Sequence, residues 1–183
     1  MALNKANNTV RISAGEWRSR LLKFPDVDGL RPTPDRVRQT VFNWLGQELY
    51  GLTCLDLFAG TGVMGFEALS RGAKQTVLIE NSRPAYQALV DNKNTLHAEN
   101  ATILNIDALQ FLKQNKLMFD VVFIDPPYNK GLVDQVLALL KPALSPEALI
   151  YVEAEMAYAD NSDWQVLKQG KAGNVFYHLL KAL

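Results

Sequence analysis

The tetrapeptide Asp125-Pro126-Pro127-Tyr128 combines residue types that can hold a planar base by its exocyclic amine. It follows an apolar run, residues 119–124, that is typical of a buried strand. The carboxylate of Asp125 and the carbonyl of Pro126 accept hydrogen bonds, and the ring of Tyr128 can cover the face of a base. Because the lone pair of such an amine is delocalised into its ring, an enzyme must aim the nitrogen at an electrophile. The motif therefore predicts an amine-methylating site with Asp125, Pro126 and Tyr128 as catalytic residues; a Pro-rich turn is the structural alternative.

Residues 60–65 match the pattern G-x-G-x-x-G between a strand-like run, residues 53–58, and a helical stretch. Gly60 and Gly62 allow a tight turn and a close approach of the backbone to a ligand, and the helix start offers unpaired amide protons. A dinucleotide site would show the same glycines, with an acid about 20 residues further on. Glu80 occupies that place. The glycines alone therefore leave the cofactor class open.

Four predicted strands each bring an acidic residue to one edge of the sheet: Asp56 lies inside its strand, Glu80 ends the next, and Asp107 and Asp125 follow the third and fourth. Such a set suits a cofactor with hydroxyls, an adenine amine and a cationic amino acid group, and S-adenosylmethionine fits this description better than a pyrophosphate does. We expect Glu80 to bind the ribose, Asp107 the adenine amine, and Asp56 the methionine end. The predicted cofactor-binding residues are Asp56, Phe58, Gly60, Gly62, Glu80, Asp107 and Ala108. A sulfonium methyl group is already activated, so we expect no metal.

Length and composition agree with one domain over residues 1–183, because 183 residues of which 48% are apolar can bury a full core. No apolar run reaches the length of a membrane span, and the N-terminus lacks the apolar stretch of a signal peptide. We therefore expect a cytoplasmic protein without a membrane partner. Cys54 is the single cysteine, which excludes an internal disulfide, and we interpret it as buried packing.

The charge is unevenly distributed along the chain. Residues 1–38 contain eight basic and four acidic side chains and carry +4, while the remainder carries −4. Residues 10–24 resemble a β-hairpin, and residues 9–32 are predicted to form a basic N-terminal extension that meets RNA. The alternative is a solvated hairpin that covers a sheet edge. The predicted RNA contacts are Arg11, Trp17, Arg18, Arg20, Arg31 and Thr33.

Strand and helix patterns alternate along the rest of the chain. We expect a helix capped by Thr33 that runs to about Leu49. Strands are predicted at 53–58, 76–80, 101–105, 119–124, 148–154, 164–168 and 175–180, with helices near 62–71, 83–96, 108–114 and 131–141. The fold class is α/β, with a doubly wound, mostly parallel seven-stranded sheet and an N-terminal β-hairpin. Ligands of such sheets bind at the carboxyl ends of the strands, where the motifs fall.

The chain resembles the RsmD family of bacterial methyltransferases. The resemblance lies in the hairpin VRISAGEWRSRLLKFP, the segment Arg31-Pro32-Thr33 with Arg36-Val37-Arg38 and Phe42-Asn43, LDLFAGTGVMGFEALSRGA, and DPPY. It implies the Rossmann-like class I methyltransferase fold with an antiparallel last strand, and S-adenosylmethionine as methyl donor. It further implies methylation of N2 of one guanine in 16S ribosomal RNA.

Three other functions remain open from the sequence. A methyltransferase of a DNA base amine would use the same DPPY motif, a nicotinamide-dependent oxidoreductase would use the same glycines, and a non-catalytic RNA-binding module would need no acidic cofactor set. Guanine is favoured because its N1–H and N2 amine are adjacent donors that one carboxylate can accept together. We expect a monomer whose partner is 16S ribosomal RNA within a small ribosomal subunit or an assembly intermediate.

Overall fold

A computed structural model describes residues 8–128 and 130–183 of the chain. Its elements, in chain order, are β1 (Thr9–Arg11), β2 (Leu21–Lys23), α1 (Asp35–Leu45), β3 (Thr53–Asp56), α2 (Val63–Ser70), β4 (Gln75–Ile79), α3 (Arg83–Leu96), β5 (Ala101–Leu104), α4 (Ala108–Gln114), β6 (Phe119–Ile124), α5 (Leu132–Leu140), a 3-10 helix (Lys141–Ala143), β7 (Leu144–Ala154), β8 (Trp164–Ala172) and β9 (Val175–Ala182). No helix in these two ranges is long and apolar enough to cross a membrane.

Seven strands form one sheet in the order β5-β4-β3-β6-β7-β9-β8. The first five are parallel to one another, whereas β9 is antiparallel to both β7 and β8. The strand order reverses next to β3, which has β4 on one side and β6 on the other. This topological switch point is the place where open α/β sheets bind ligands. The predicted fold class, including the antiparallel last strand, is confirmed.

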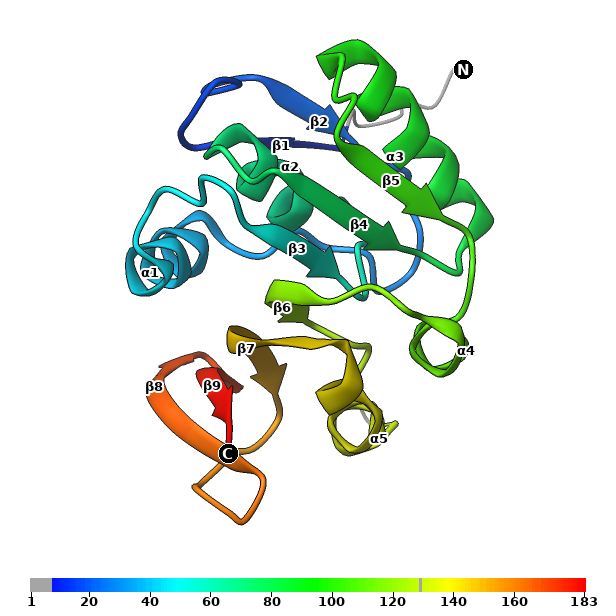
Figure 1. Cartoon of the computed structure of the whole chain (residues 1–183). Helices are drawn as coiled ribbons and strands as arrows, with labels where there is room; N and C mark the ends of the chain where they lie inside the picture. The colour runs from blue at the N-terminus through cyan, green and yellow to red at the C-terminus, as the bar shows by residue number, and fades with distance from the viewer. Residues whose placement is uncertain (1–7, 129) are drawn as a thin grey trace.

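Helices cover both faces of the sheet (Figure 1). One core contains side chains of α1, α2 and α3 packed on Cys54, Leu78, Val121 and Phe123. The other contains side chains of α4 and α5 packed on the alternate strand residues, such as Leu55 and Val122. Because neighbouring residues of a strand point to opposite faces, the continuous apolar runs of β3, β4 and β6 supply both cores. Cys54 is buried, as predicted.

Strands β1 and β2 pair as a separate two-stranded sheet on the α2 and α3 side (Figure 1). The segment between them docks on α2, where the Glu67 carboxylate accepts hydrogen bonds from the backbone N–H of Ser13 (2.9 Å) and of Ala14 (3.0 Å). Glu67 is fully buried and also pairs with Arg38 at 3.2 Å and Arg71 at 3.0 Å. Glu67 is therefore one of the groups that fix the N-terminal extension to the sheet domain, together with Ser70 of α2 and Asn92 of α3, whose side chains also bond to its backbone.

Two predictions about the ends of helix α1 are wrong. Thr33 does not cap α1: the N-cap is Pro34, no side chain caps the helix, and Thr33 is buried. The helix also ends at Leu45 and not near Leu49, because Gly46 adopts the left-handed conformation (φ +97°) and its N–H bonds back to Asn43. Glycine is the residue that takes this conformation without steric cost.

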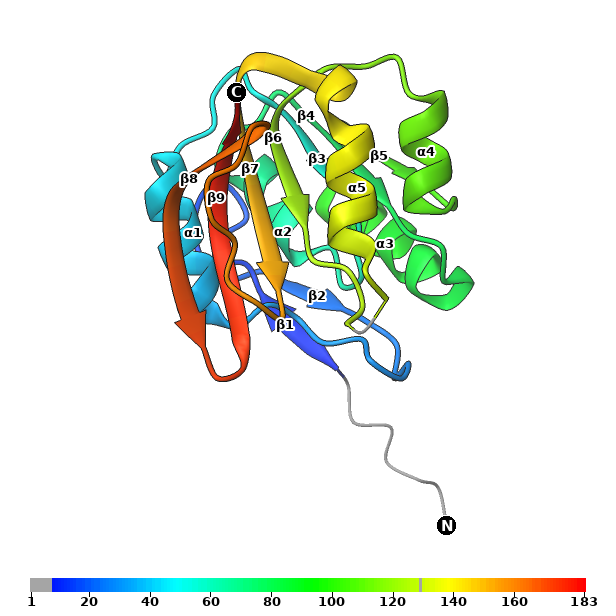
Figure 2. The same ribbon diagram turned by 90° about the horizontal axis from the view of Figure 1, so that it is seen from below.

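The N-terminal hairpin is shorter than expected. Arg18 and Arg20 lie in the segment between β1 and β2 and not in a strand. In the C-terminal hairpin the strands are longer than expected, since β8 continues to Ala172. Figure 2 shows the turn between β8 and β9 at the end of the sheet where β6 and β7 finish.

Candidate active site at the carboxyl edge of the sheet

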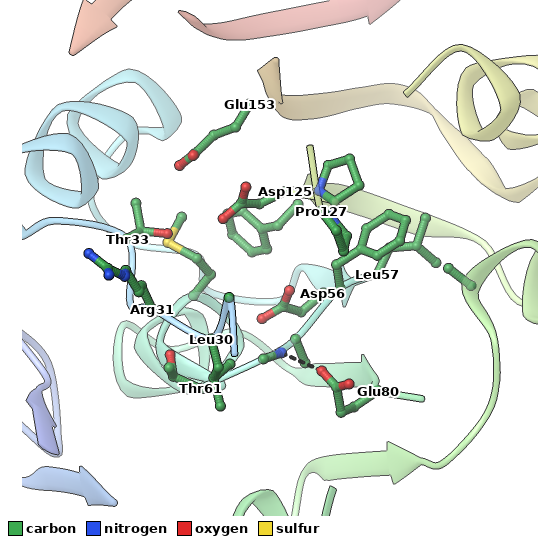
Figure 3. Close-up of a pocket in the computed structure, with 18 of the residues that line it drawn as sticks. Leu30, Arg31, Thr33, Asp56, Leu57, Thr61, Glu80, Asp125, Pro127 and Glu153 are labelled. Carbon is green, nitrogen blue, oxygen red and sulfur yellow. Dashed lines mark hydrogen bonds between the residues drawn. The ribbon is translucent and has the colours of Figure 1, made fainter. Parts of the chain in front are cut away.

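A cavity of about 760 Å³ opens at the carboxyl ends of the parallel strands. This volume lies in the range of small-molecule sites. Its walls come from the segment that leads into α1, the β3–α2 loop, the loops after β4, β5 and β6, the end of β7, and the β8–β9 hairpin. The labelled residues in Figure 3 surround this space from several of these segments, so the glycine loop, the predicted acids and the DPPY motif converge on one site.

The glycine motif shapes the floor of the cavity. Gly62 precedes α2 with φ +79°, and a β-carbon there would lie 2.4 Å from Leu89 Cδ2. Gly65 donates its N–H to Asp56 Oδ2 at 3.0 Å, and a β-carbon there would lie 2.8 Å from Leu78 Cδ2. A larger residue at position 62 would therefore collide with α3, and one at position 65 would push α2 away from β4. The three glycines bring the start of the helix close to the strand ends.

Five neighbouring parallel strands each bring one acid to this edge. In the spatial order of the sheet these are Asp107 after β5, Glu80 after β4, Asp56 at the end of β3, Asp125 after β6 and Glu153 near the end of β7. All five line the cavity. The structure thus unites the four predicted acids and adds Glu153, which was not predicted as a site residue.

The acids on the β5, β4 and β3 side organise the backbone around them. Glu80 accepts from Gly60 N–H with Oε2 and from Ser82 N–H with Oε1, both at 2.8 Å (Figure 3). Asp107 caps α4 by accepting from Gln110 N–H at 3.0 Å. Burial raises the pKa of the Asp56 carboxyl to about 7, although the hydrogen bond from the Gly65 N–H lowers it in part. A cation bound here would favour the ionised form of Asp56.

On the other side of the switch point, Asp125 and Glu153 form a carboxyl pair in which Glu153 is buried and Asp125 is partly exposed. The two side chains share a hydrogen bond, and Tyr151 Oη donates to Glu153 Oε1 at 2.5 Å. Burial, and then the charge of Glu153, raises the pKa of Asp125 well above its usual range. Burial also raises the pKa of Glu153, while hydrogen bonds from Tyr151 and Asp125 oppose this. Such perturbed groups in a cavity are candidates for proton transfer.

The rest of the DPPY motif also lines the cavity. Tyr128 is 44% exposed, Pro127 is exposed and Pro126 is buried. Burial, followed by the charges of Asp125 and Glu153, raises the pKa of the Tyr128 hydroxyl to about 12, so the ring stays neutral at physiological pH. An exposed neutral ring next to a carboxyl that lines the cavity is the arrangement expected for stacking on a base while its edge is held.

The predicted RNA contacts fall into two groups. Arg31 and Thr33 line the cavity. Among the described residues the lining begins at Val27, so it does not include Arg11, Trp17, Arg18 or Arg20. Trp17 is half-buried and packs against the core.

The basic side chains before residue 39 differ in their surroundings. Arg20 Nη2 donates to the carbonyl of Thr95 at 3.1 Å, and Arg11 Nη1 donates to the carbonyl of Ser19 at 2.9 Å. Arg38, which contributed to the basic count, is buried and paired with Glu67 and Asp35, and Lys5 lies outside the described residues. The basic surface is therefore smaller than the sequence indicated.

Known proteins of similar sequence and structure carry methyltransferase names. "Ribosomal RNA small subunit methyltransferase D" of Escherichia coli K12 is 43% identical, over 96% of this chain and 91% of that protein. The Haemophilus influenzae protein of the same name is 44% identical, over 95% and 94%. The solved structure of an Escherichia coli putative methyltransferase, yhhF, superposes with a TM-score of 0.86 at 44% identity, covering 96% of this chain and 98% of that one.

The family model described as conserved hypothetical protein 95 matches residues 10–181. The match spans the N-terminal hairpin, the glycine loop, the DPPY motif and the C-terminal hairpin. The chain therefore belongs to this family, the RsmD family that its motifs predicted.

Proposed function

We propose that the protein is an S-adenosylmethionine-dependent methyltransferase that modifies the exocyclic N2 amine of a guanine in 16S ribosomal RNA. The observation that carries the proposal is the division of the acid-lined cavity at the switch point. Glu80, Asp56 and the glycine loop lie on one side of it, and Asp125 with Tyr128 lies on the other. The names of the relatives support ribosomal RNA over DNA as the substrate.

The cofactor half of the cavity has hydrogen-bond acceptors and charges that fit S-adenosylmethionine. Glu80 already accepts two backbone N–H groups, but a carboxylate has about four acceptor sites and can also take ribose hydroxyls. Asp107 uses Oδ1 for its helix cap, which leaves Oδ2 for the adenine amine. Asp56, with the loop Gly60–Gly62, would meet the cationic methionine end; Phe58 and Ala108 complete the proposed set. The bound cofactor supplies an activated sulfonium methyl group.

The acceptor half positions the base. The Asp125 carboxylate would accept from guanine N1–H and from the N2 amine, the carbonyl of Pro126 would accept the remaining amine proton, and Tyr128 would stack on the base. Held in this way, the lone pair of N2 would point at the methyl group that the bound cofactor would supply, and Asp125 and Pro126 would accept from the amine that loses one proton. Catalysis therefore depends on orientation, with charge and hydrogen bonding supplied by Asp125.

The RNA surface is proposed to begin at the rim of the cavity. Arg31 and Lys130 are exposed cations that line the opening from two different loops. Arg11, Trp17, Arg18 and Arg20 remain proposed contacts on a second surface, where they would meet more distant nucleotides. The substrate context proposed is a small ribosomal subunit or an assembly intermediate in the cytoplasm, with the enzyme acting as a monomer.

Two double variants separate the rim from the hairpin. Arg31→Ala with Lys130→Ala should raise the apparent KM for RNA and reduce the slope of log affinity against log salt by roughly 1.5, at 0.7 to 0.9 per lost phosphate contact. We expect a similar reduction for Arg18→Ala with Arg20→Ala. Both should leave S-adenosylmethionine affinity unchanged. RNA binding at several salt concentrations, with a melting curve for each variant, measures this; an unaltered salt slope in the hairpin variant would confine the RNA surface to the rim.

The proposed function is tested by incubating the protein with labelled S-adenosylmethionine and small-subunit particles, free 16S RNA or duplex DNA. Mass mapping of the nucleosides should show N2-methylguanosine in the ribosomal samples. Calorimetry should show binding of S-adenosylmethionine and weaker or no binding of NAD. Label in DNA alone would support the DNA-amine alternative, and preferential NAD binding would support the oxidoreductase.

A further inference from the structure

Glu153 is a buried acid that lines the cavity, and the register between β6 and β7 determines its position. Ile124 of β6 is paired with Val152 of β7, so the residues that follow them, Asp125 and Glu153, lie side by side where the strands end. Figure 3 shows both carboxyl groups on the same wall of the cavity. The arrangement is therefore built into the sheet and does not depend on a loop conformation.

The side chain of Glu153 is held from both ends. Tyr151, two residues earlier on the same strand face, donates its hydroxyl to Glu153 at 2.5 Å, and Asp125 shares a hydrogen bond with the same carboxyl. Tyr151 is itself fully buried and packs edge-on against Phe123 of β6. A buried carboxyl is costly unless it is hydrogen-bonded, and here its partners are a tyrosine and the proposed base-binding residue.

The strand order places Glu153 away from the cofactor half of the site. Strand β7 is separated from β3, β4 and β5 by β6, which carries Asp125. A role on the cofactor is therefore less suited to Glu153 than a role on Asp125. The amine that Asp125 is proposed to hold must lose a proton as its bond to the methyl carbon forms, and a carboxylate beside a second carboxylate is a better proton acceptor than one alone.

We infer that Glu153 is a positioning residue for methyl transfer: held by Tyr151, it makes Asp125 the group that takes the proton released by the base amine. This inference rests on the proposed function. In the step, the N2 lone pair forms the nitrogen–carbon bond, the carbon–sulfur bond breaks with its electrons on sulfur, and one N2 proton passes to an Asp125 oxygen. The proton then leaves through the open side of the cavity.

The pH dependence has a defined direction. Asp125 must be ionised to accept from the base, so activity falls as the pH drops through its raised pKa. Removing the Glu153 charge lowers that pKa and moves the acid limb of the kcat profile to lower pH, while the weaker base reduces the plateau. The other titratable or charged groups around the pair are Asp56, Tyr128, Tyr151, Glu155, Tyr177, Arg31 and Lys130.

The test compares Glu153→Gln and Tyr151→Phe with the parent, using 16S RNA and S-adenosylmethionine at saturating concentrations across pH. In Glu153→Gln we expect kcat on the plateau to fall about tenfold and the acid limb to move down by about one pH unit or more. The KM for RNA and the affinity for S-adenosylmethionine should stay near the parent values. Tyr151→Phe, which keeps the buried ring, should give a smaller shift in the same direction. Glu147→Gln, an exposed acid on the same strand, is the matched control.

The outcomes distinguish this inference from the function on which it rests. A parent protein without methyl transfer would overturn the proposed function. An active parent with an unmoved acid limb in both variants would overturn the role of Glu153, and so would a raised KM for RNA at unchanged kcat. If Glu153→Gln fails to fold, the acid limb of Tyr151→Phe decides, because that variant loses one hydroxyl and no core volume.

Discussion

Replacing Asp125 with alanine is expected to lower kcat for methylation of the RNA by about 10²- to 10⁴-fold, the range for a positioned proton acceptor. Asp125 lines the cavity on the β6 side of the switch point, away from Glu80 and the glycine loop. The loss should therefore appear in kcat, and S-adenosylmethionine affinity measured by calorimetry should stay within several-fold of the parent. Tyr128→Ala is likewise expected to reduce methylation while leaving S-adenosylmethionine affinity within several-fold of the parent.

The variant Asp125→Asn tests the choice of base. Guanine presents two adjacent donors, N1–H and the N2 amine, and an amide offers one acceptor and one donor in place of two acceptors. A donor would then face a donor, so methylation of guanine should be strongly reduced while the shape of the site is kept. Parent-like activity of Asp125→Asn would contradict this account of base recognition, and a parallel loss of cofactor affinity would move Asp125 to the cofactor half.

Replacing Glu67 with alanine is expected to reduce the free energy of unfolding by about 3–5 kcal/mol, as for other buried ion pairs that lose one partner. The change removes the acceptor of the Ser13 and Ala14 N–H groups and leaves the buried guanidinium of Arg38 and the one of Arg71 without this carboxylate. Urea denaturation followed by circular dichroism measures the loss.

The matched control for Glu67 is Glu16→Ala, an exposed acid in the segment between β1 and β2 that should change stability little. The N-terminal extension, which docks on Glu67, should also become more susceptible to proteolysis in Glu67→Ala. A loss below about 1 kcal/mol, the size of an exposed ion pair, would contradict the anchoring role of this carboxylate.

The sequence by itself determined the class of fold and most of the cavity wall. The G-x-G-x-x-G and DPPY motifs each follow a short apolar run, and such runs alternate with helices along the chain. Parallel strands end at one edge, so acids placed directly after them had to meet there. This is why Asp56, Glu80, Asp107 and Asp125 were predicted together and line one cavity.

Glu153 was missed because its role depends on its neighbour across the sheet. Within its own strand it is one acid in the apolar run Leu149-Ile150-Tyr151-Val152-Glu153-Ala154. An acid in such a run, two residues after a tyrosine, was the only sign in the sequence that Glu153 belongs to the site. Only the pairing of Ile124 with Val152 puts Glu153 beside Asp125. A shift of one residue in that register would turn its side chain to the other face of the sheet.

Tertiary structure also decided which charges are available to a partner. Arg38 and Arg20 look alike in the sequence, yet Arg38 is buried against Glu67, while Arg20 is exposed and reaches the carbonyl of Thr95. Side-chain charge follows from residue type, whereas pairing and burial follow from contacts between residues far apart in the chain. The sequence therefore determined which acidic and aromatic side chains lie at the strand ends. The packing of the N-terminal extension on α2 determined which of its basic side chains remain at the surface, because a charge is buried only where a distant partner compensates it.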